Sequence, residues 1–254
     1  NLGSAQFALK QLDAAIASYD KAITIDPNSA NSFYNRGNIL RKLKKLDAAV
    51  ASYDRAISIE PDHAEAYFKR GLALQKLINP EAAITSYNRA IELKLESAAL
   101  YCSRGNVLLE LEQPDSAIAS YNKAITLKPD YAEAYNNRGT ALEKLKKLDA
   151  AVTSYDKAIT LNPELELAYY NRGIALQKLN RLDTAIASFN RAIALNPASD
   201  KAFSGLGRIY LKQGNHNEAL ELIYRGSGLI RFSLVSGVQF LEESTGEKNW
   251  FELH

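Results

Sequence analysis

The stretch that decides the fold runs from Ala30 to Ala64, ANSFYNRGNILRKLKKLDAAVASYDRAISIEPDHA. The chain copies this stretch at a constant spacing of 34 residues, from its first residues to about residue 227. Its glycine recurs as Gly3, Gly37, Gly71, Gly105, Gly139, Gly173 and Gly207. One of its alanines recurs as Ala15, Ala49, Ala83, Ala117, Ala151, Ala185 and Ala219. A fixed period without drift indicates a repeat array rather than a single globular core.

Each copy predicts two helices. With Ala30 counted as position 1, apolar or small residues lie at positions 3–4, 8, 10–11 and 14, and again at positions 17, 20–21, 24, 27–28 and 30. Both stripes follow helical spacing. Pro61 cannot continue the second helix and marks its end. Every repeat is therefore expected to form a pair of antiparallel helices.

The glycine at position 8 needs a physical reason, because glycine inside a helix costs about 1 kcal/mol relative to alanine. We expect the two helices of a repeat to approach closely there. The aromatic residue at position 24 would then lie across the gap left by the small residues at positions 8, 20 and 27. This aromatic residue is Tyr19, Tyr53, Tyr87, Tyr121, Tyr155 and finally Phe189.

Taken together, the aromatic, Gly, Leu, Ala, aromatic, Ala and Pro at positions 4, 8, 11, 20, 24, 27 and 32 resemble the tetratricopeptide repeat (TPR) over roughly residues 1–227. The resemblance implies an all-α fold, a right-handed superhelical solenoid of antiparallel helix pairs. Because this family is a scaffold with many unrelated partners, the resemblance alone does not name a function.

The period also sets the expected domain organisation. Residues 1–29 are a partial repeat, residues 30–63, 64–97, 98–131, 132–165 and 166–199 are full repeats, and residues 200–227 are a degenerate last repeat. Residues 228–254 depart from the period, and apolar and polar residues alternate on both sides of Gly237. This pattern is typical of a β-hairpin. We expect a short C-terminal cap over the apolar end of the solenoid, with a dimer contact or the start of a further domain as alternatives.

Composition gives no sign of a nucleic-acid or membrane partner. The 31 basic and 29 acidic residues leave a net charge of +2, far from the excess of a nucleic-acid-binding domain. No apolar run approaches the ~18 residues that indicate a membrane span. The chain contains no Met and begins inside a repeat, so we interpret it as a fragment of a longer protein. We expect a cytoplasmic location, although a missing signal peptide is no evidence for it in a fragment.

The sequence contains no candidate set of catalytic residues. His63, His216 and His254 lie far apart, and no zinc-protease, phosphate-loop or paired-cysteine motif occurs. Cys102 has no histidine near it in sequence to hold it as a thiolate. We expect no catalytic residues, no cofactor and no metal site.

An arginine recurs at position 7 of every full repeat. We expect its stem to pack along the helix pair and its guanidinium group to bond between repeats. A basic ladder for an acidic ligand is the alternative. The residues are Arg36, Arg70, Arg104, Arg138 and Arg172.

The candidate binding site follows from the TPR resemblance, which implies that the first helices line a concave face. Positions 2, 5, 6, 9, 12 and 13 would point into it. A carboxamide there can pair with a peptide N–H and C=O together, and rings can hold side chains. The predicted peptide-binding groove comprises Tyr34, Asn35, Asn38, Phe68, Asn106, Asn136, Asn137, Tyr170 and Asn171. Ordinary surface is the alternative.

Position 13 carries a lysine in most repeats. The predicted basic rim comprises Lys42, Lys76, Lys144, Lys178 and Lys212. Cations at the end of a helix favour its dipole, which is one explanation. A rim that steers acidic peptides is the other.

Two ligand patterns of the family fit poorly. The clamp for chaperone tails needs lysines where Asn136 and Ser204 stand. The asparagine ladder of O-linked N-acetylglucosamine transferases uses position 6, where Asn35, Asn137 and Asn171 match but Lys69, Ser103 and Gly205 do not.

We therefore expect a non-catalytic protein–protein interaction scaffold that binds a peptide segment of a partner protein in its concave groove. One alternative is the substrate-recruiting arm of a larger enzyme, such as a glycosyltransferase. Another is a structural module that forms a homo-oligomer through its chain ends.

Overall fold

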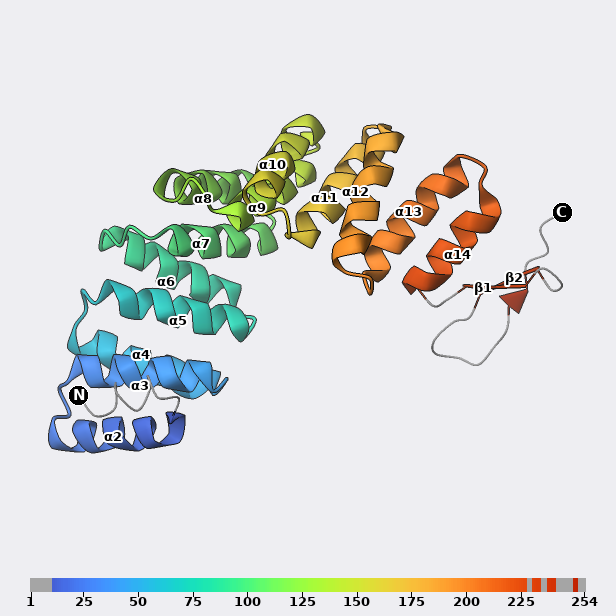
Figure 1. Ribbon diagram of the computed structural model, residues 1–254. Helices are drawn as coiled ribbons and strands as arrows, with labels where there is room; N and C mark the ends of the chain where they lie inside the picture. Colours follow the sequence, from blue (N-terminus) through green and yellow to red (C-terminus); the bar gives the residue numbers. More distant parts are fainter. Residues whose placement is uncertain (1–10, 228–229, 234–236, 241–248, 251–254) are drawn as a thin grey trace. The chain divides into compact units, whose positions relative to one another are not determined.

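The computed structural model describes residues 11–227, 230–233, 237–240 and 249–250 (Figure 1). This described part contains thirteen helices and three short strands. The helices are α2 (Leu12–Ile25), α3 (Ala30–Lys42), α4 (Leu46–Ile59), α5 (Ala64–Lys76), α6 (Pro80–Glu92), α7 (Ala98–Glu110), α8 (Pro114–Leu127), α9 (Ala132–Lys144), α10 (Leu148–Leu161), α11 (Glu166–Lys178), α12 (Leu182–Leu195), α13 (Asp200–Lys212) and α14 (His216–Ser227). The predicted all-α repeat fold is confirmed.

Two compact units make up the chain, residues 1–129 with helices α2–α8 and residues 130–254 with helices α9–α14. Within each unit the two helices of a repeat pack against each other, and the second helix packs against the first helix of the next repeat. Each unit is thus a stack of helix pairs (Figure 1).

The core of each repeat is built around the aromatic residue at position 24. Tyr53, Tyr87, Tyr121 and Tyr155 are 0% exposed. A Cβ placed on Gly105 would lie 2.5 Å from a ring carbon of Tyr121, which is closer than van der Waals contact allows. This confirms why position 8 is glycine: any side chain there would occupy the space of the ring.

The turn between the two helices of a repeat has an unusual backbone. At position 15 the φ angle is positive in Lys44, Ile78, Glu112, Lys146, Asn180 and Gly214. In the second full repeat the N–H of Asn79 donates to the carbonyl of Leu74 at 3.0 Å. This six-residue return bond is that of a Schellman motif, whose left-handed residue is usually glycine or asparagine.

Ile78 is the least suited residue in this series, because β-branched side chains rarely adopt a positive φ. Its φ is 57° and its side chain is 89% exposed, so it gains little from packing. We expect Ile78→Asn to raise the free energy of unfolding by about 1 kcal/mol, since the left-handed conformation costs an ordinary residue roughly 1–2 kcal/mol. Urea denaturation followed by circular dichroism measures this change.

Lys44→Ile, at the same turn of the preceding repeat, is the matched control and should be destabilising. If Ile78→Asn left stability unchanged and Lys44→Ile did too, the left-handed turn would not be a source of strain.

Beyond α14 the structure describes three strands, β1 (Ile230–Ser233), β2 (Gly237–Phe240) and β3 (Asn249–Trp250). β1 and β2 pair antiparallel with Ile230 opposite Phe240, and β2 pairs antiparallel with β3. Residues 234–236, 241–248 and 251–254 lie outside the described part. That this segment caps the last helix pair stays a prediction.

Candidate functional site

The first helices of successive repeats contact one another directly. In the first unit α3 contacts α5 and α5 contacts α7; in the second, α9 contacts α11 and α11 contacts α13. Among the described residues the second helices make no comparable contact with each other. The first helices therefore line the inner face of each unit, where the predicted groove residues lie.

Two predicted groove residues belong to the core instead. Phe68 is only 7% exposed, and its ring centroid lies 6.1 Å from that of Tyr87. Asn136 is 3% exposed. The prediction that position 5 points into an open groove does not hold for these two buried side chains, so truncating Phe68 would damage the fold rather than only a binding surface.

The other two aromatic residues are half-buried. The Tyr34 ring lies 6.1 Å from that of Tyr53 and 4.8 Å from that of His63. The Tyr170 ring lies 6.0 Å from that of Phe189. Each ring therefore packs against the aromatic residue of its own repeat and stays partly exposed.

The asparagines at position 9 also have a role inside the repeat. The hydroxyl of Tyr53 donates to Oδ1 of Asn38 at 2.9 Å, and the hydroxyl of Tyr121 donates to Oδ1 of Asn106 at 2.8 Å. Burial raises the pKa of Tyr53 to about 12, so the phenol keeps its proton and needs an acceptor. These two amides satisfy a buried hydroxyl, which sequence reasoning missed.

Three predicted groove asparagines bond to one another in the second unit. Asn136 Nδ2 donates to Asn137 Oδ1 at 3.1 Å, and Asn171 Nδ2 donates to Asn136 Oδ1 at 3.1 Å. The network joins α9 to α11. Only part of its hydrogen-bonding capacity is left for a ligand.

Asn35 differs from the other groove amides. It is half-buried on α3, and its carboxamide makes no hydrogen bond with the residues that the structure describes. A half-buried amide that has no partner among the described residues is a candidate for contact with a ligand.

The position-7 arginines serve the framework, as expected. Arg70 Nε contacts Asp54 Oδ1 at 2.6 Å in the preceding repeat, and an Nη donates to Ser86 Oγ at 2.8 Å in its own repeat. The same clamp joins Arg36 to Asp20 and Ser52, Arg104 to Asn88 and Ser120, and Arg172 to Asp156 and Ser188. These guanidinium groups are already engaged between repeats.

The predicted basic rim is exposed at all five lysines. Lys178 Nζ contacts Glu143 Oε1 at 2.7 Å, and Lys212 Nζ donates to Asn180 Oδ1 at 2.7 Å. Steering of acidic peptides by this rim stays a prediction.

Two basic residues on the inner face of the first unit were missed by sequence reasoning, Arg41 at position 12 and Lys69 at position 6. Burial and the nearby charge of Arg41 lower the pKa of Lys69. The Nε of Arg41 is buried and has no hydrogen-bond partner among the described residues. The signal in the sequence is their departure from the other repeats, which carry no basic residue at either position.

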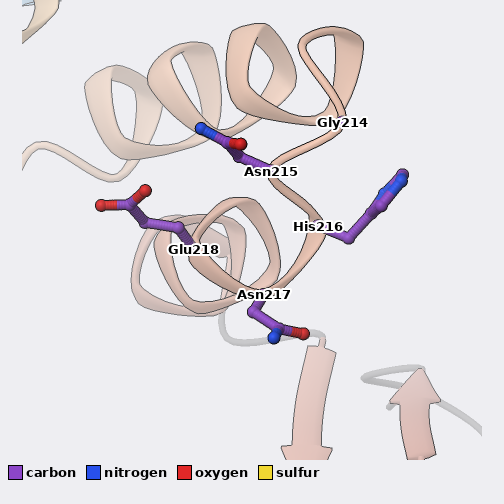
Figure 2. Close-up of a pocket in the computed structure, with 5 residues that line it drawn as sticks. All are labelled: Gly214, Asn215, His216, Asn217 and Glu218. Atoms are coloured by element: carbon purple, nitrogen blue, oxygen red, sulfur yellow. The ribbon is translucent and has the colours of Figure 1, made fainter.

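A surface hollow lies at the turn between α13 and α14, lined by Gly214, Asn215, His216, Asn217 and Glu218 (Figure 2). All five residues are exposed. Figure 2 shows the side chains of His216, Asn217 and Glu218 pointing in different directions. The hollow therefore assembles no catalytic or binding group.

Within the described ranges no three His, Cys, Asp or Glu side chains could jointly hold a metal ion. Cys102 is 4% exposed. None of the helices that the structure describes has the length and apolar character needed to cross a membrane.

Comparisons with known proteins agree with this architecture. Family models described as TPR repeat match residues 3–43, 37–77 and 105–146, and models described as tetratricopeptide repeat match residues 64–97, 132–165, 167–199 and 188–221. No curated protein matches the sequence significantly.

Several solved structures are similar. The crystal structure of YrrB, described as a TPR protein with an unusual peptide-binding site, is 26% identical with a TM-score of 0.64, and the match covers 72% of this chain and 95% of that one. The crystal structure of MamA is 26% identical with a TM-score of 0.61, covering 63% and 94%. The C-terminal part of a TPR repeat-containing protein from Cytophaga hutchinsonii is 17% identical with a TM-score of 0.70, covering 89% and 95%.

The period, the glycine–aromatic packing and the family models thus lead to one assignment. This chain belongs to the tetratricopeptide repeat family, whose fold is a scaffold for interaction with protein partners.

Proposed function

We propose that this chain is a non-catalytic interaction module that binds a peptide segment of a partner protein along the inner face of its first helices. The observation that carries the proposal is the half-buried carboxamide of Asn35 on α3, which makes no hydrogen bond with the residues that the structure describes. Tyr34 precedes Asn35 on α3, and its half-buried ring offers an apolar contact. Lys69 occupies the same position 6 on α5, which contacts α3, and offers a charged contact.

These groups suit a peptide. A carboxamide can pair with the N–H and C=O of an extended backbone, and a partly exposed aromatic ring provides an anchor for an apolar side chain. The structural similarity to YrrB, whose description includes a peptide-binding site, supports the same class of ligand. The set of predicted groove residues becomes smaller, because four of them are buried or bonded within the repeats. These are Phe68, Asn38, Asn106 and Asn136.

The basic rim should affect the rate at which an acidic peptide associates. Exposed lysines raise the local concentration of acidic segments and accelerate association without changing close contacts. A rise in salt from 50 to 500 mM should slow association more than it speeds dissociation.

The experiment selects peptides that bind the protein from a random 12-residue display library and measures the affinity of one selected peptide by fluorescence anisotropy. Asn35→Ala should weaken binding by roughly fivefold, the effect of about 1 kcal/mol from one hydrogen bond. Truncation at this position should leave the fold intact, because the Asn35 side chain is only half-buried and makes no hydrogen bond within the described part of the chain.

Asn190→Ala, on an exposed position of the second helix α12, is the matched control and should bind as the parent does. Asp156 would be a poor control, because it is paired with Arg172 at 2.6 Å. Equal affinity of the Asn35 and Asn190 variants would contradict binding along the inner face of the first unit.

A further inference from the structure

We propose that the junction between α6 and α7 is a hinge of the first unit, at which consecutive repeats change their angle more easily than at the other junctions of that unit. Residues 93–97 form this junction, between the end of α6 at Glu92 and the start of α7 at Ala98. The hinge goes beyond the proposed function and does not depend on it. Three local departures from the repeat indicate it: a missing proline, helix ends that are closed by their own hydrogen bonds, and an arginine clamp without an ion pair.

The junction lacks the proline that restricts the other loops between repeats. Proline holds its own φ near −65° and confines the residue before it to an extended backbone. Glu60, which precedes Pro61, accordingly has a φ of −129°. Leu95 stands at this position of the α6–α7 junction and imposes neither restriction. The loops with proline at position 32 contain Pro27, Pro61, Pro129, Pro163 and Pro197.

The helix before the junction also ends differently. α6 ends at Glu92, which is position 29, whereas α4 and α8 each extend to position 30. Lys94 has a positive φ of 61°, and the N–H of Leu95 donates to the carbonyl of Ala90 at 3.0 Å. This is the return bond of a Schellman motif, which a proline at position 32 could not make because it has no N–H. The C-terminus of α6 is therefore closed without the residues that follow.

The helix after the junction is closed locally as well. Ser97 Oγ accepts a hydrogen bond from the N–H of Leu100 at 3.4 Å and caps α7. The other first helices that the structure describes have no side-chain cap. At the α4–α5 junction the N–H of His63 donates back to the carbonyl of Glu60 at 3.1 Å, and within the described residues no equivalent bond joins Ser97 to Lys94. Residues 94–97 thus link two helices that each end in their own bonds.

The arginine clamp across this junction contains no ion pair. Arg104 Nε donates to Oδ1 of Asn88, a neutral amide, at 2.8 Å. At the α4–α5 junction Arg70 Nε contacts the carboxylate of Asp54 at 2.6 Å, and the α2–α3 junction has the same kind of Arg–Asp pair. A hydrogen bond between two charged groups is stronger than one with a neutral partner. The directional bond between repeats is therefore weaker at α6–α7 than at the other two junctions of the first unit.

Apolar packing keeps the two sides of the junction together. Leu100 is 0% exposed and shares a buried cluster with Tyr87 of α6, and Leu95 packs against the same cluster. Apolar contact is non-directional, so it permits a small change of angle between packed helices. The pair of Lys123 with Glu96, at 3.4 Å, lies at the surface, where an ion pair contributes little. Retained packing with few directional bonds is the combination that a hinge requires.

Bending at this junction acts on the inner face, because α5 and α7 contact each other there. A change of their angle widens or narrows the face on the two sides of the hinge. The first unit can then adjust to bound segments of different bulk, whatever their chemistry.

The test compares this junction with its neighbour by double electron–electron resonance on the full 254-residue chain. Buried Cys102 is replaced by alanine, so that nitroxide labels attach only to introduced cysteines. Thr85→Cys with Ala119→Cys spans α6–α7, and the matched pair Ala51→Cys with Thr85→Cys spans α4–α5; all three are exposed residues at position 22. The distance distribution across α6–α7 should be about twice as wide, because its loop can absorb φ and ψ changes that proline forbids. A distribution no wider than that across α4–α5 overturns the proposal.

Asn88→Asp tests the part of the clamp, because it gives Arg104 the carboxylate partner that Arg70 already has. The distribution across α6–α7 should become narrower. Asn190→Asp is the matched control: it makes the same charge change at position 25 of α12, but position 7 of the next repeat is Leu206 rather than arginine. It should leave the distribution across α6–α7 as in the parent. No narrowing with Asn88→Asp, or equal narrowing with both variants, would overturn the part assigned to the clamp.

The reciprocal change is made at the neighbouring junction. Asp54→Asn gives the α4–α5 junction the neutral clamp found at α6–α7, while Pro61 still restricts its loop. The α4–α5 distribution should widen, but should stay narrower than that across α6–α7. Widening to the full α6–α7 value would overturn the part assigned to the missing proline. Circular dichroism checks that every variant keeps the helical content of the parent.

Discussion

Replacement of Tyr121 by alanine is expected to lower the free energy of unfolding by about 3–5 kcal/mol, as for other buried aromatic truncations. The ring is 0% exposed and lies between α7 and α8, against Gly105. Its removal loses apolar burial and leaves a cavity in the middle of the first unit's last repeat. Urea denaturation followed by circular dichroism measures the change. Tyr224→Ala is the control, because Tyr224 is 43% exposed and its truncation should cost less than about 1 kcal/mol.

The hydroxyl of Tyr121 accounts for a separate part of this loss. Tyr121→Phe keeps the ring but removes the donor to Asn106 Oδ1, which lies at 2.8 Å. This variant separates the contribution of the hydroxyl from that of the ring. It should lower the free energy of unfolding by roughly 1 kcal/mol, the usual contribution of one hydrogen bond. A Tyr121→Ala protein as stable as the parent would contradict the packing assigned to position 24.

The packing of the repeat could be predicted from the sequence because one constraint recurs in each of the five full repeats. Glycine at position 8 and an aromatic residue at position 24 recur together, and only close helix approach accounts for glycine in mid-helix. The structure shows the aromatic ring in the place that a Cβ would take at Gly37, Gly71, Gly105, Gly139 and Gly173.

The groove residues were harder to predict, because the position of a residue in the repeat does not show which side chain it will hydrogen-bond. The position-9 amides were assigned to a ligand, although Asn38 and Asn106 accept bonds from buried tyrosines. The sequence held no consistent sign of this role, because position 9 is the apolar Leu72 in the repeat of Tyr87, whose hydroxyl donates to Gln75 Oε1 at 3.0 Å instead.

Residues that depart from the repeat pattern could not be interpreted from the sequence. Arg41 and Lys69 have no basic counterpart in the other repeats, so the repeat pattern predicts no role for either of them.

The second large effect is expected at Gly105. Gly105→Ala should lower the free energy of unfolding by about 1–3 kcal/mol, the usual cost of overpacking a core. The new Cβ would lie 2.5 Å from one ring carbon of Tyr121 and 2.8 Å from another. The ring is fully buried and cannot move aside into solvent. This loss of stability is opposite to the effect of helix propensity, because alanine favours a helix over glycine by about 1 kcal/mol.

A double-mutant cycle between Gly105 and Tyr121 tests this explanation by its sign. In the Tyr121→Ala background the space beside Gly105 is empty, so Gly105→Ala should become neutral or stabilise by up to about 1 kcal/mol through helix propensity alone. The two changes contact each other directly, so a strong departure from additivity is expected. If Gly105→Ala cost the same in both backgrounds, the glycine would be needed for the backbone itself. The repeated pairing of positions 8 and 24 would then require another physical reason.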